Sequence, residues 1–254
     1  MKLKYVYGPV YSWRLGISIG VDLVTHRKVC SFDCIYCQLG KTDVKTLERG
    51  VFVPTDEVLM EVDYALSRVD RVDYLTFSGK GEPLLAKNIR EVVQILKKEY
   101  DVPLALLTNS SLISEASSEI LEIDNIVAKL DACTQDVFEV VNNPVGGLLV
   151  RDIIHDLRNF RQEYNGKLSV QVMLVNHNFK QAEKLAEVIR GIEPDEVHLN
   201  TPLRPCKTNP LSKQAMREVK EIFRDLNVKM VYDHLKKEKI TPLDKLETRK
   251  RRPE

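Results

Sequence analysis

The alternation of strand-like and helical segments is the feature that most constrains the fold of this chain. Short runs of β-branched and apolar residues predict strands. Each is followed by a segment with apolar residues at helical spacing, as at Val58, Val62 and Ala65. The predicted strands are 16–24, 72–79, 102–110, 124–132, 168–175 and 195–200, and the predicted helices are 55–69, 89–100, 113–122, 146–164, 179–191 and 213–226.

Strand–helix units repeated in this way imply an α/β fold with a parallel sheet, either open or curled into a barrel. At 254 residues, with 43% hydrophobic and 30% charged residues, the chain has the size and composition of one folded domain of this type. We therefore predict a single domain over 1–254. It has a short N-terminal extension, a core at about 15–226 and a charged, helical C-terminal tail at 236–254.

Charge and hydropathy limit the binding partners and the cellular compartment that can be expected for this chain. Lys and Arg number 38 against 37 for Asp and Glu, so no overall field recruits nucleic acid or an anionic membrane. No apolar run has the length of a signal peptide or of a membrane span, which predicts a cytoplasmic protein without membrane contact. The basic stretch RKRR at 249–252 is interpreted as a disordered, solubilising end, with contact to RNA phosphates as the alternative.

Polar residues follow several predicted strands where each strand ends. In parallel α/β folds the loops after the strands meet at one rim, and active sites form there. Ordinary turn chemistry is the alternative for each residue taken singly. The residues expected at this rim are Ser78, Gly79, Lys80, Gly81, Glu82 and Pro83 after the second strand, Asn109 after the third, Lys129 and Asp131 after the fourth, and Asn200 after the sixth.

The stretch CSFDCIYC places Cys30, Cys34 and Cys37 within eight residues. In a reducing compartment, clustered cysteines indicate metal binding or redox work. Three thiolates can each bind one iron of a cubane cluster and leave the fourth iron open. A zinc site is one alternative, with His26 as the nearest histidine, and thiol–disulfide exchange by the last two cysteines is another.

The spacing of the three cysteines, with Tyr36 before the last, resembles the signature of radical S-adenosylmethionine enzymes. The resemblance covers nearly the whole chain, since this superfamily uses a partial (β/α)6 TIM-like barrel. FSGKGEP resembles the glycine-rich motif that contacts the methionine amino group, with Lys80 in place of the commoner glycine. The flanking segments YGPVYSWRLGISIGVD and LNTPLRPC resemble iron–sulfur oxidoreductases related to wyosine-base synthases, which act on transfer RNA. Those synthases carry further cysteines for a second cluster, and none precedes Cys30 here.

The resemblance implies a 4Fe–4S cluster held by the three cysteines, S-adenosylmethionine on the open iron, and an electron donor such as a flavodoxin or ferredoxin. Reductive cleavage of S-adenosylmethionine would give a 5'-deoxyadenosyl radical that abstracts hydrogen from a substrate. The cofactor-binding residues that it implies are Tyr36, Ser78, Gly79, Gly81, Glu82, Pro83, Asn109, Lys129, Asp131 and Asn200.

The substrate stays open at this point, with catalytic candidates Arg14 and Lys80. Arg14 is expected either to hold a carboxylate or phosphate or to lie solvated in a hairpin, and Lys80 either to form an imine or to neutralise an acidic neighbour. A transfer RNA base is the first hypothesis. A peptide or small molecule, as for a glycyl-radical activase, is the second, and a non-catalytic cluster or metal protein is the third. The oligomeric state cannot be predicted from these patterns.

Overall fold

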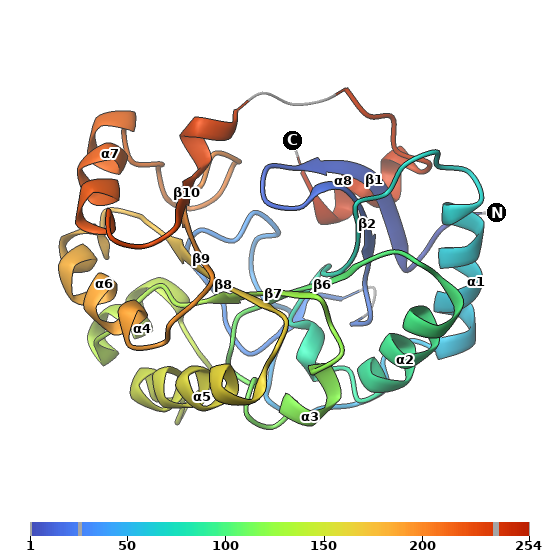
Figure 1. Ribbon diagram of the computed structural model, residues 1–254, viewed down its shortest axis with the longest axis horizontal. Helices are drawn as coiled ribbons and strands as arrows, with labels where there is room; N and C mark the ends of the chain where they lie inside the picture. Colours follow the sequence, from blue (N-terminus) through green and yellow to red (C-terminus); the bar gives the residue numbers. More distant parts are fainter. Residues whose placement is uncertain (1, 25–26, 236–238, 254) are drawn as a thin grey trace.

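The computed structural model describes residues 2–24, 27–235 and 239–253. Within them, the main feature is an eight-stranded sheet in the order β1-β2-β5-β6-β7-β8-β9-β10. β1 is antiparallel to β2, and the other neighbouring pairs are parallel. Figure 1 shows this sheet curled into an arc with helices along its outer side. Its strands are β1 (Val6–Ser12), β2 (Gly16–Val21), β5 (Tyr74–Phe77), β6 (Leu104–Thr108), β7 (Asn125–Lys129), β8 (Lys167–Met173), β9 (Glu196–Asn200) and β10 (Val228–Met230).

The remaining elements are a small sheet and the helices. Two short parallel strands, β3 (Val29–Cys30) and β4 (Val44–Lys45), form the small sheet. Short 3-10 turns lie at η1 (Pro83–Leu85), η2 (Phe179–Gln181) and η3 (Val231–His234). The helices are α1 (Thr55–Leu66), α2 (Ile89–Glu99), α3 (Ser117–Ile120), α4 (Gln135–Asn142), α5 (Val150–Glu163), α6 (Ala182–Arg190), α7 (Lys213–Ile222) and α8 (Lys245–Arg251).

The predicted partial parallel barrel is confirmed. The six predicted strands correspond to β2 and to β5 through β9. These strands are short and apolar because both of their faces are covered, and Leu104, Ala105 and Leu106 of β6 are fully buried. The outer helices supply the other side of the core: α2 buries Ile89 and Val93, one turn apart, while its lysines end the helix.

Several elements were not predicted. β1 had no assignment, although it forms with β2 the hairpin that one interpretation of Arg14 assumed. β10 extends the sheet beyond β9, and α4 occupies a stretch with no assigned structure. The predicted helix at 113–122 is wrong for most of its length, since only α3 is helical there. Leu112, Ile113 and Ala116 are buried in turns, so they give helical spacing without a helix.

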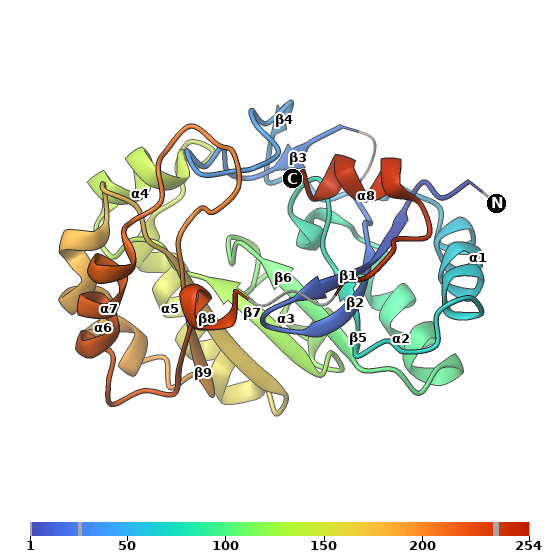
Figure 2. The same ribbon diagram turned by 90° about the horizontal axis from the view of Figure 1, so that it is seen from above.

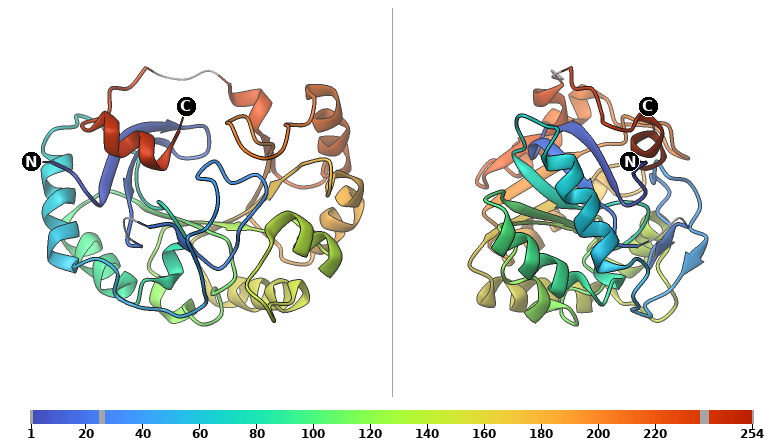
Figure 3. Two further views of the ribbon diagram at one scale, coloured as in Figure 1. Left: turned by 180° about the vertical axis from the view of Figure 1, so that it is seen from behind. Right: turned by 90° about the vertical axis from the view of Figure 1, so that its right-hand side faces the viewer.

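The C-terminal tail is folded where the structure describes it. The expected helical tail is present as α8, which begins with the Asp244 carboxylate accepting from Glu247 N at 3.0 Å. It lies beside β1, as Figures 1 and 3 show. The interpretation of RKRR as a disordered end is wrong, because the Arg251 side chain is only 1% exposed. No helix in the described residues combines the length and apolarity needed to cross a membrane.

Candidate functional site

The cysteine segment lies over one rim of the curled sheet. In Figure 2, β3 and β4 stand above the sheet on the same side as α8. Cys30 ends β3, and Cys34 and Cys37 follow in the next turns; all three are half-buried free thiols. Gln38, directly after the segment, donates from Nε2 to the Arg251 carbonyl at 3.2 Å, so the C-terminal helix touches the cysteine loop.

Two amide side chains face the cysteine sulfurs. Asn109 Nδ2 lies 3.5 Å from Cys30 Sγ, and Asn142 Nδ2 lies 3.6 Å from Cys34 Sγ. Amide donors favour sulfur in its negatively charged form, as in iron–sulfur sites. Burial raises the pKa of the Cys30 thiol to about 12 and that of Cys34 to about 11, so positive iron is needed to keep both as thiolates.

The residues present fit a cubane cluster. Among the described residues, no three Cys, His, Asp or Glu side chains converge on one metal ion. A cubane does not need such convergence, because each thiolate binds a different iron. His26, the nearest histidine considered for zinc, lies outside the described residues.

Tyr36 joins the cysteine segment to the strand ends. It is buried, and its hydroxyl donates to Asp131 Oδ2. Asp131 is also buried and accepts from Asn142 Nδ2 at 2.8 Å and from Met173 N at 2.7 Å. Lys129 Nζ lies 3.6 Å from Asp131 and 4.2 Å from the centre of the Tyr36 ring. The predicted residues Tyr36, Lys129 and Asp131 therefore form one group beside Cys34.

Glu82 lies on the Cys30 side of the site and is 2% exposed. Its carboxylate accepts from Thr108 Oγ1 at 2.6 Å, from Asn109 N at 2.7 Å and from Leu84 N at 3.1 Å. Burial nevertheless raises the pKa of Glu82 to about 7, against the lowering effect of these donors. Ionised Glu82 is therefore costly until a cation lies next to it.

We expect this cost to appear as a pH dependence of stability in the cluster-free protein. Because the folded pKa of Glu82 exceeds its ordinary value of 4.5, its contribution is complete below pH 4.5 and is lost as the pH rises through 7. Between pH 5.5 and 8, the wild type should lose about 2 kcal/mol of unfolding free energy relative to Glu82→Gln. Urea unfolding at both pH values measures it. The exposed-site control Glu48→Gln should follow the wild type, and parallel curves for wild type and Glu82→Gln would contradict the assignment.

Gly79 and Gly81 are required by the protein itself. A Cβ on Gly79 would lie 2.1 Å from Asp22 Cγ, and one on Gly81 would lie 1.6 Å from the Val29 carbonyl oxygen. The same Val29 oxygen accepts from Glu82 N at 3.1 Å. The glycines therefore let the FSGKGEP segment approach the strand that leads into Cys30, a reason independent of any bound cofactor.

The other predicted residues lie at different distances from this centre. Ser78 follows β5 and pairs with the Tyr7 hydroxyl at 2.8 Å, while Pro83 opens η1 under Glu82. Lys80 donates from its backbone N to Asp22 at 3.3 Å. Asn200 ends β9, where its side chain accepts from Thr201 N and its carbonyl from Leu174 N. Within the described residues, Asn200 forms no hydrogen bond with the cysteine segment.

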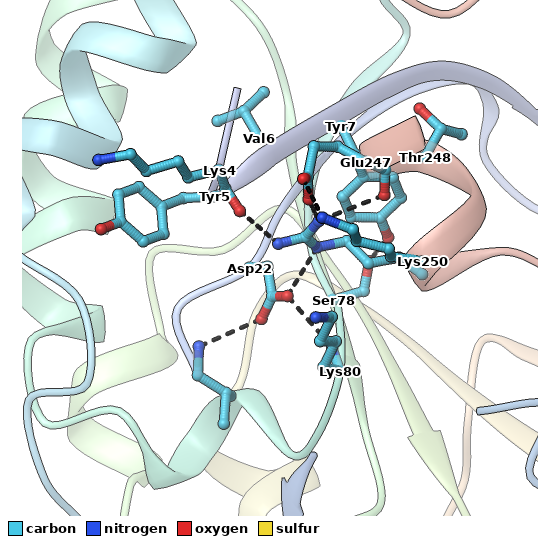
Figure 4. Close-up of polar contacts among 12 residues, drawn as sticks. Lys4, Tyr5, Val6, Tyr7, Asp22, Ser78, Lys80, Glu247, Thr248 and Lys250 are labelled. Atoms are coloured by element: carbon cyan, nitrogen blue, oxygen red, sulfur yellow. Dashed lines mark hydrogen bonds and ion pairs between the residues drawn. The ribbon is translucent and has the colours of Figure 1, made fainter. Parts of the chain in front are cut away.

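Asp22 is the point where the C-terminal helix is fastened to the site. Arg251 Nε donates to Asp22 Oδ2 at 2.7 Å, and both side chains are 1% exposed. Arg251 Nη1 also donates to Glu247 Oε2 at 2.8 Å. Figure 4 shows Asp22 with Lys80, Lys4 and Glu247 around this contact. The ion pair therefore fixes α8 against the loop between β2 and the cysteines.

A cavity of about 230 Å³ opens beside Gly79 and Gly81. Arg14, predicted either to bind an anion or to lie solvated, lines it from the turn between β1 and β2, and its Nε is buried. The fully solvated interpretation is therefore wrong. Lys80 is not among the lining residues, although its glycine neighbours are.

Sequence reasoning missed four polar residues of this region. Asn142 comes from α4, a helix that was not predicted, and Asp22 reads in sequence as an ordinary residue after a strand. Arg251 and Arg252 were assigned to a solvated tail. For the two arginines the only local signal is the basic run RKRR itself, which is equally typical of a solvated end.

Comparison with known proteins agrees with this geometry. The family model for the radical SAM superfamily matches residues 24–189. The UPF0026 protein of Synechocystis is 38% identical over 212 residues, covering 82% of this chain and 78% of that protein. The UPF0026 protein of Methanocaldococcus jannaschii is 32% identical over 232 residues, covering 89% of this chain and 72% of that protein.

A solved structure shares the fold. The structure of Streptococcus suis SuiB bound to S-adenosylmethionine superimposes with a TM-score of 0.64 at 13% identity. The match covers 82% of this chain and 49% of SuiB. At this identity the likeness speaks for the fold alone, and it agrees with the curled parallel sheet described above.

Proposed function

This chain belongs to the radical SAM superfamily, and from that premise we propose that it cleaves S-adenosylmethionine reductively and directs the resulting radical to a substrate in the cavity beside Gly79 and Gly81. As a member it is an enzyme whose cofactors are a 4Fe–4S cluster and S-adenosylmethionine. The proposal concerns where this chain holds them and what it acts on.

One observation carries the proposal. The backbone N of Glu82 donates to the carbonyl of Val29, the residue before Cys30. This bond ties the segment that bears the buried carboxylate to the segment that bears the thiolates. A cation held by Glu82 is therefore placed next to a cluster held by the cysteines, and neither segment can shift without the other.

The roles proposed for the residues follow from their chemistry. Cys30, Cys34 and Cys37 each bind one iron and leave the fourth for S-adenosylmethionine. Glu82 accepts from the ammonium of that cofactor, which favours the ionised carboxylate and removes the burial cost described above. Tyr36 offers a flat face that Asp131 holds in place, and Asn109 and Lys129 offer polar contacts beside it.

The cofactors supply one-electron cleavage to methionine and a 5'-deoxyadenosyl radical. The chain supplies orientation and the exclusion of water. The buried Asp22–Arg251 pair and the Gln38–Arg251 contact hold α8 over the rim, so the site is covered from one side by a helix that has no predicted catalytic role. A reductant is the remaining partner that this chemistry requires.

The observations favour a small substrate over transfer RNA. The two segments that resemble wyosine-base synthases supply Ser12, Arg14 and Arg204, and all three line the same cavity. The resemblance of these two segments therefore concerns residues that line one small, open cavity. Arg251 and Arg252, the tail arginines considered for RNA phosphates, also face this cavity. Action on a transfer RNA base stays a hypothesis that requires the base to enter there.

The experiment is anaerobic reconstitution of the full chain with iron and sulfide, followed by incubation with dithionite and S-adenosylmethionine. We expect 5'-deoxyadenosine by mass spectrometry, and only background in the triple variant Cys30→Ala, Cys34→Ala, Cys37→Ala. The matched control Cys133→Ala removes a half-buried thiol outside the cysteine segment and should retain formation. Zinc without cubane iron in the purified protein, or equal product from the triple variant, would contradict the proposal.

A further inference from the structure

Four arginines from distant parts of the chain line the cavity beside Gly79 and Gly81. Arg14 comes from the β1–β2 turn, Arg204 from the loop after β9, and Arg251 and Arg252 from the end of α8. Arg251 is neutralised by Asp22 and Glu247. Arg204 donates from Nη1 to the neutral Gln38 side chain at 2.6 Å. The cavity thus brings together guanidinium groups that are far apart in the sequence.

Arg14 and Arg252 are the unbalanced pair. Among the described residues, no carboxylate forms an ion pair with either of them. Arg252 donates from both Nη atoms to the Tyr11 carbonyl at 3.1 Å, and Arg14 Nε is buried without a hydrogen-bond partner. Buried charged donors are almost always paired, because burying one without a partner costs a large amount of folding free energy. A partner from outside the chain is therefore expected.

The arginines also repel one another. Burial, then the charge of Arg252, then that of Arg204, lowers the pKa of Arg14 to about 9. Burial likewise lowers the pKa of Arg252. Each of these effects would be opposed by a negative group placed between the guanidinium planes. The described part of the chain therefore leaves Arg14 and Arg252 without a compensating negative charge.

Arg14 is held in position before any ligand arrives. Its guanidinium carbon lies 4.9 Å from the centre of the Trp13 ring. That ring packs edge-on against buried His198 at 5.5 Å and stacks on His234 at 6.0 Å. Arg252 is fixed by Tyr11 of β1. Guanidinium groups held in this way lose little conformational entropy when they bind an oxyanion, as in a preorganised binding site.

The walls between the arginines carry hydroxyl groups as well as the apolar side chains of Val10, Leu15 and Leu107. The hydroxyls of Tyr7 and Ser78, both drawn in Figure 4, lie 2.8 Å apart, and those of Ser18 and Thr76 lie 2.5 Å apart. These four hydroxyls line the cavity, and each can donate to or accept from a ligand. The volume of about 230 Å³ suits a compact molecule rather than a folded polymer.

We infer that this cavity binds the oxyanion of a small organic substrate, a carboxylate or a phosphate ester, with Arg14 and Arg252 as its ligands and the hydroxyls of Tyr7, Ser18, Thr76 and Ser78 contacting the rest of the molecule. Planar guanidinium groups match both oxyanions through paired hydrogen bonds. The inference rests on the proposed function, because Gly79 and Gly81 border both the cavity and the cofactor segment. Beyond the proposed function, it states that the substrate is an anion and that Arg14 and Arg252 select it.

Titration calorimetry on the anaerobically reconstituted full chain tests the site without reductant. Citrate and pyrophosphate serve as the carboxylate and phosphate probes, with chloride keeping the ionic strength constant. At least one probe should bind to one site per chain, and Arg14→Gln and Arg252→Gln should each weaken it about tenfold or more. The charge-matched control Arg217→Gln, on the exposed face of α7, should bind as the wild type does. The stronger probe decides between the two oxyanions.

Several outcomes would overturn the inference. If Arg217→Gln weakened probe binding as much as the cavity variants do, the net charge of the protein and not the cavity would explain the binding. Competition between the probe and S-adenosylmethionine would mean that the arginines hold the carboxylate of the cofactor. If a single-stranded RNA bound more tightly than either probe, and Arg14→Gln and Arg252→Gln abolished that binding, RNA and not a small molecule would be the ligand. If Arg14→Gln does not fold, Arg14→Lys is the replacement variant. It keeps the positive charge, and it should still weaken probe binding several-fold because it lacks the planar guanidinium. Probe binding without 5'-deoxyadenosine formation would contradict the proposed function only.

Discussion

Replacing Arg251 by alanine should lower the unfolding free energy by about 3–5 kcal/mol, the range for breaking a buried ion pair from one side. The change leaves the buried Asp22 carboxylate without its cation. It also frees Glu247 Oε2 and the Lys4 carbonyl, which Arg251 contacts at 2.8 Å and 2.5 Å. Few single changes remove so many partners of buried groups at once.

Urea unfolding of the cluster-free chain measures this loss, with Lys245→Ala as the control. Lys245 is an exposed cation of the same helix, and its loss should change stability by less than about 0.5 kcal/mol. The double variant Asp22→Asn, Arg251→Met should recover most of the loss, because position 22 then carries no buried charge and Glu247 keeps Lys250 as its cation. Equal stability of Arg251→Ala and Lys245→Ala would contradict the buried pair.

The loss in Arg251→Ala should also depend on pH. Burial raises the pKa of Asp22 even with Arg251 present, which lowers it in part. Without Arg251 that pKa rises further, so the variant regains stability relative to the wild type as acid protonates Asp22. The difference between the two proteins should therefore be smaller at pH 5 than at pH 8. A constant difference would assign the loss to packing alone.

The barrel and the cysteine segment could be predicted because their signals are local. A buried parallel strand such as β6 is an apolar run, and the three cysteines stand within one turn-rich stretch. Glu82 and Asp131 could be expected at the rim for the same reason, since each lies in the loop that follows a strand. The end of a strand can be located in the sequence, and it places the residues that follow at the rim.

The arginine cavity could not be predicted because its contacts are distant in sequence. Arg251 and Asp22 are separated by 229 positions, and nothing near either residue indicates a partner. A basic terminus also has the composition of a solvated end. Arg14 carried two interpretations, and the solvated one fails because Arg14 lines the cavity with its Nε buried. Asn142 was missed because its helix, α4, is short and was not assigned.

The link between these parts makes Gly81 the most sensitive position in the site. In Gly81→Ala the new Cβ would stand 1.6 Å from the Val29 carbonyl oxygen, which belongs to backbone and cannot rotate away. Either the FSGKGEP segment or β3 must move, and the bond from Glu82 N to that oxygen is lost with it. Overpacking of this kind costs about 1–3 kcal/mol and more where backbone must shift.

Because Val29 precedes Cys30, the displacement should reach the cluster. We expect Gly81→Ala to retain less than about a tenth of the wild-type iron and sulfide after anaerobic reconstitution, because a misplacement of about 1 Å is enough to disable a site. Iron analysis and the visible absorbance of the cluster measure this. Gly146→Ala is the matched control, since a Cβ there meets nothing within 4 Å. If Gly81→Ala loaded iron as fully as that control, the bond between the glutamate segment and the cysteine segment would not hold the site together.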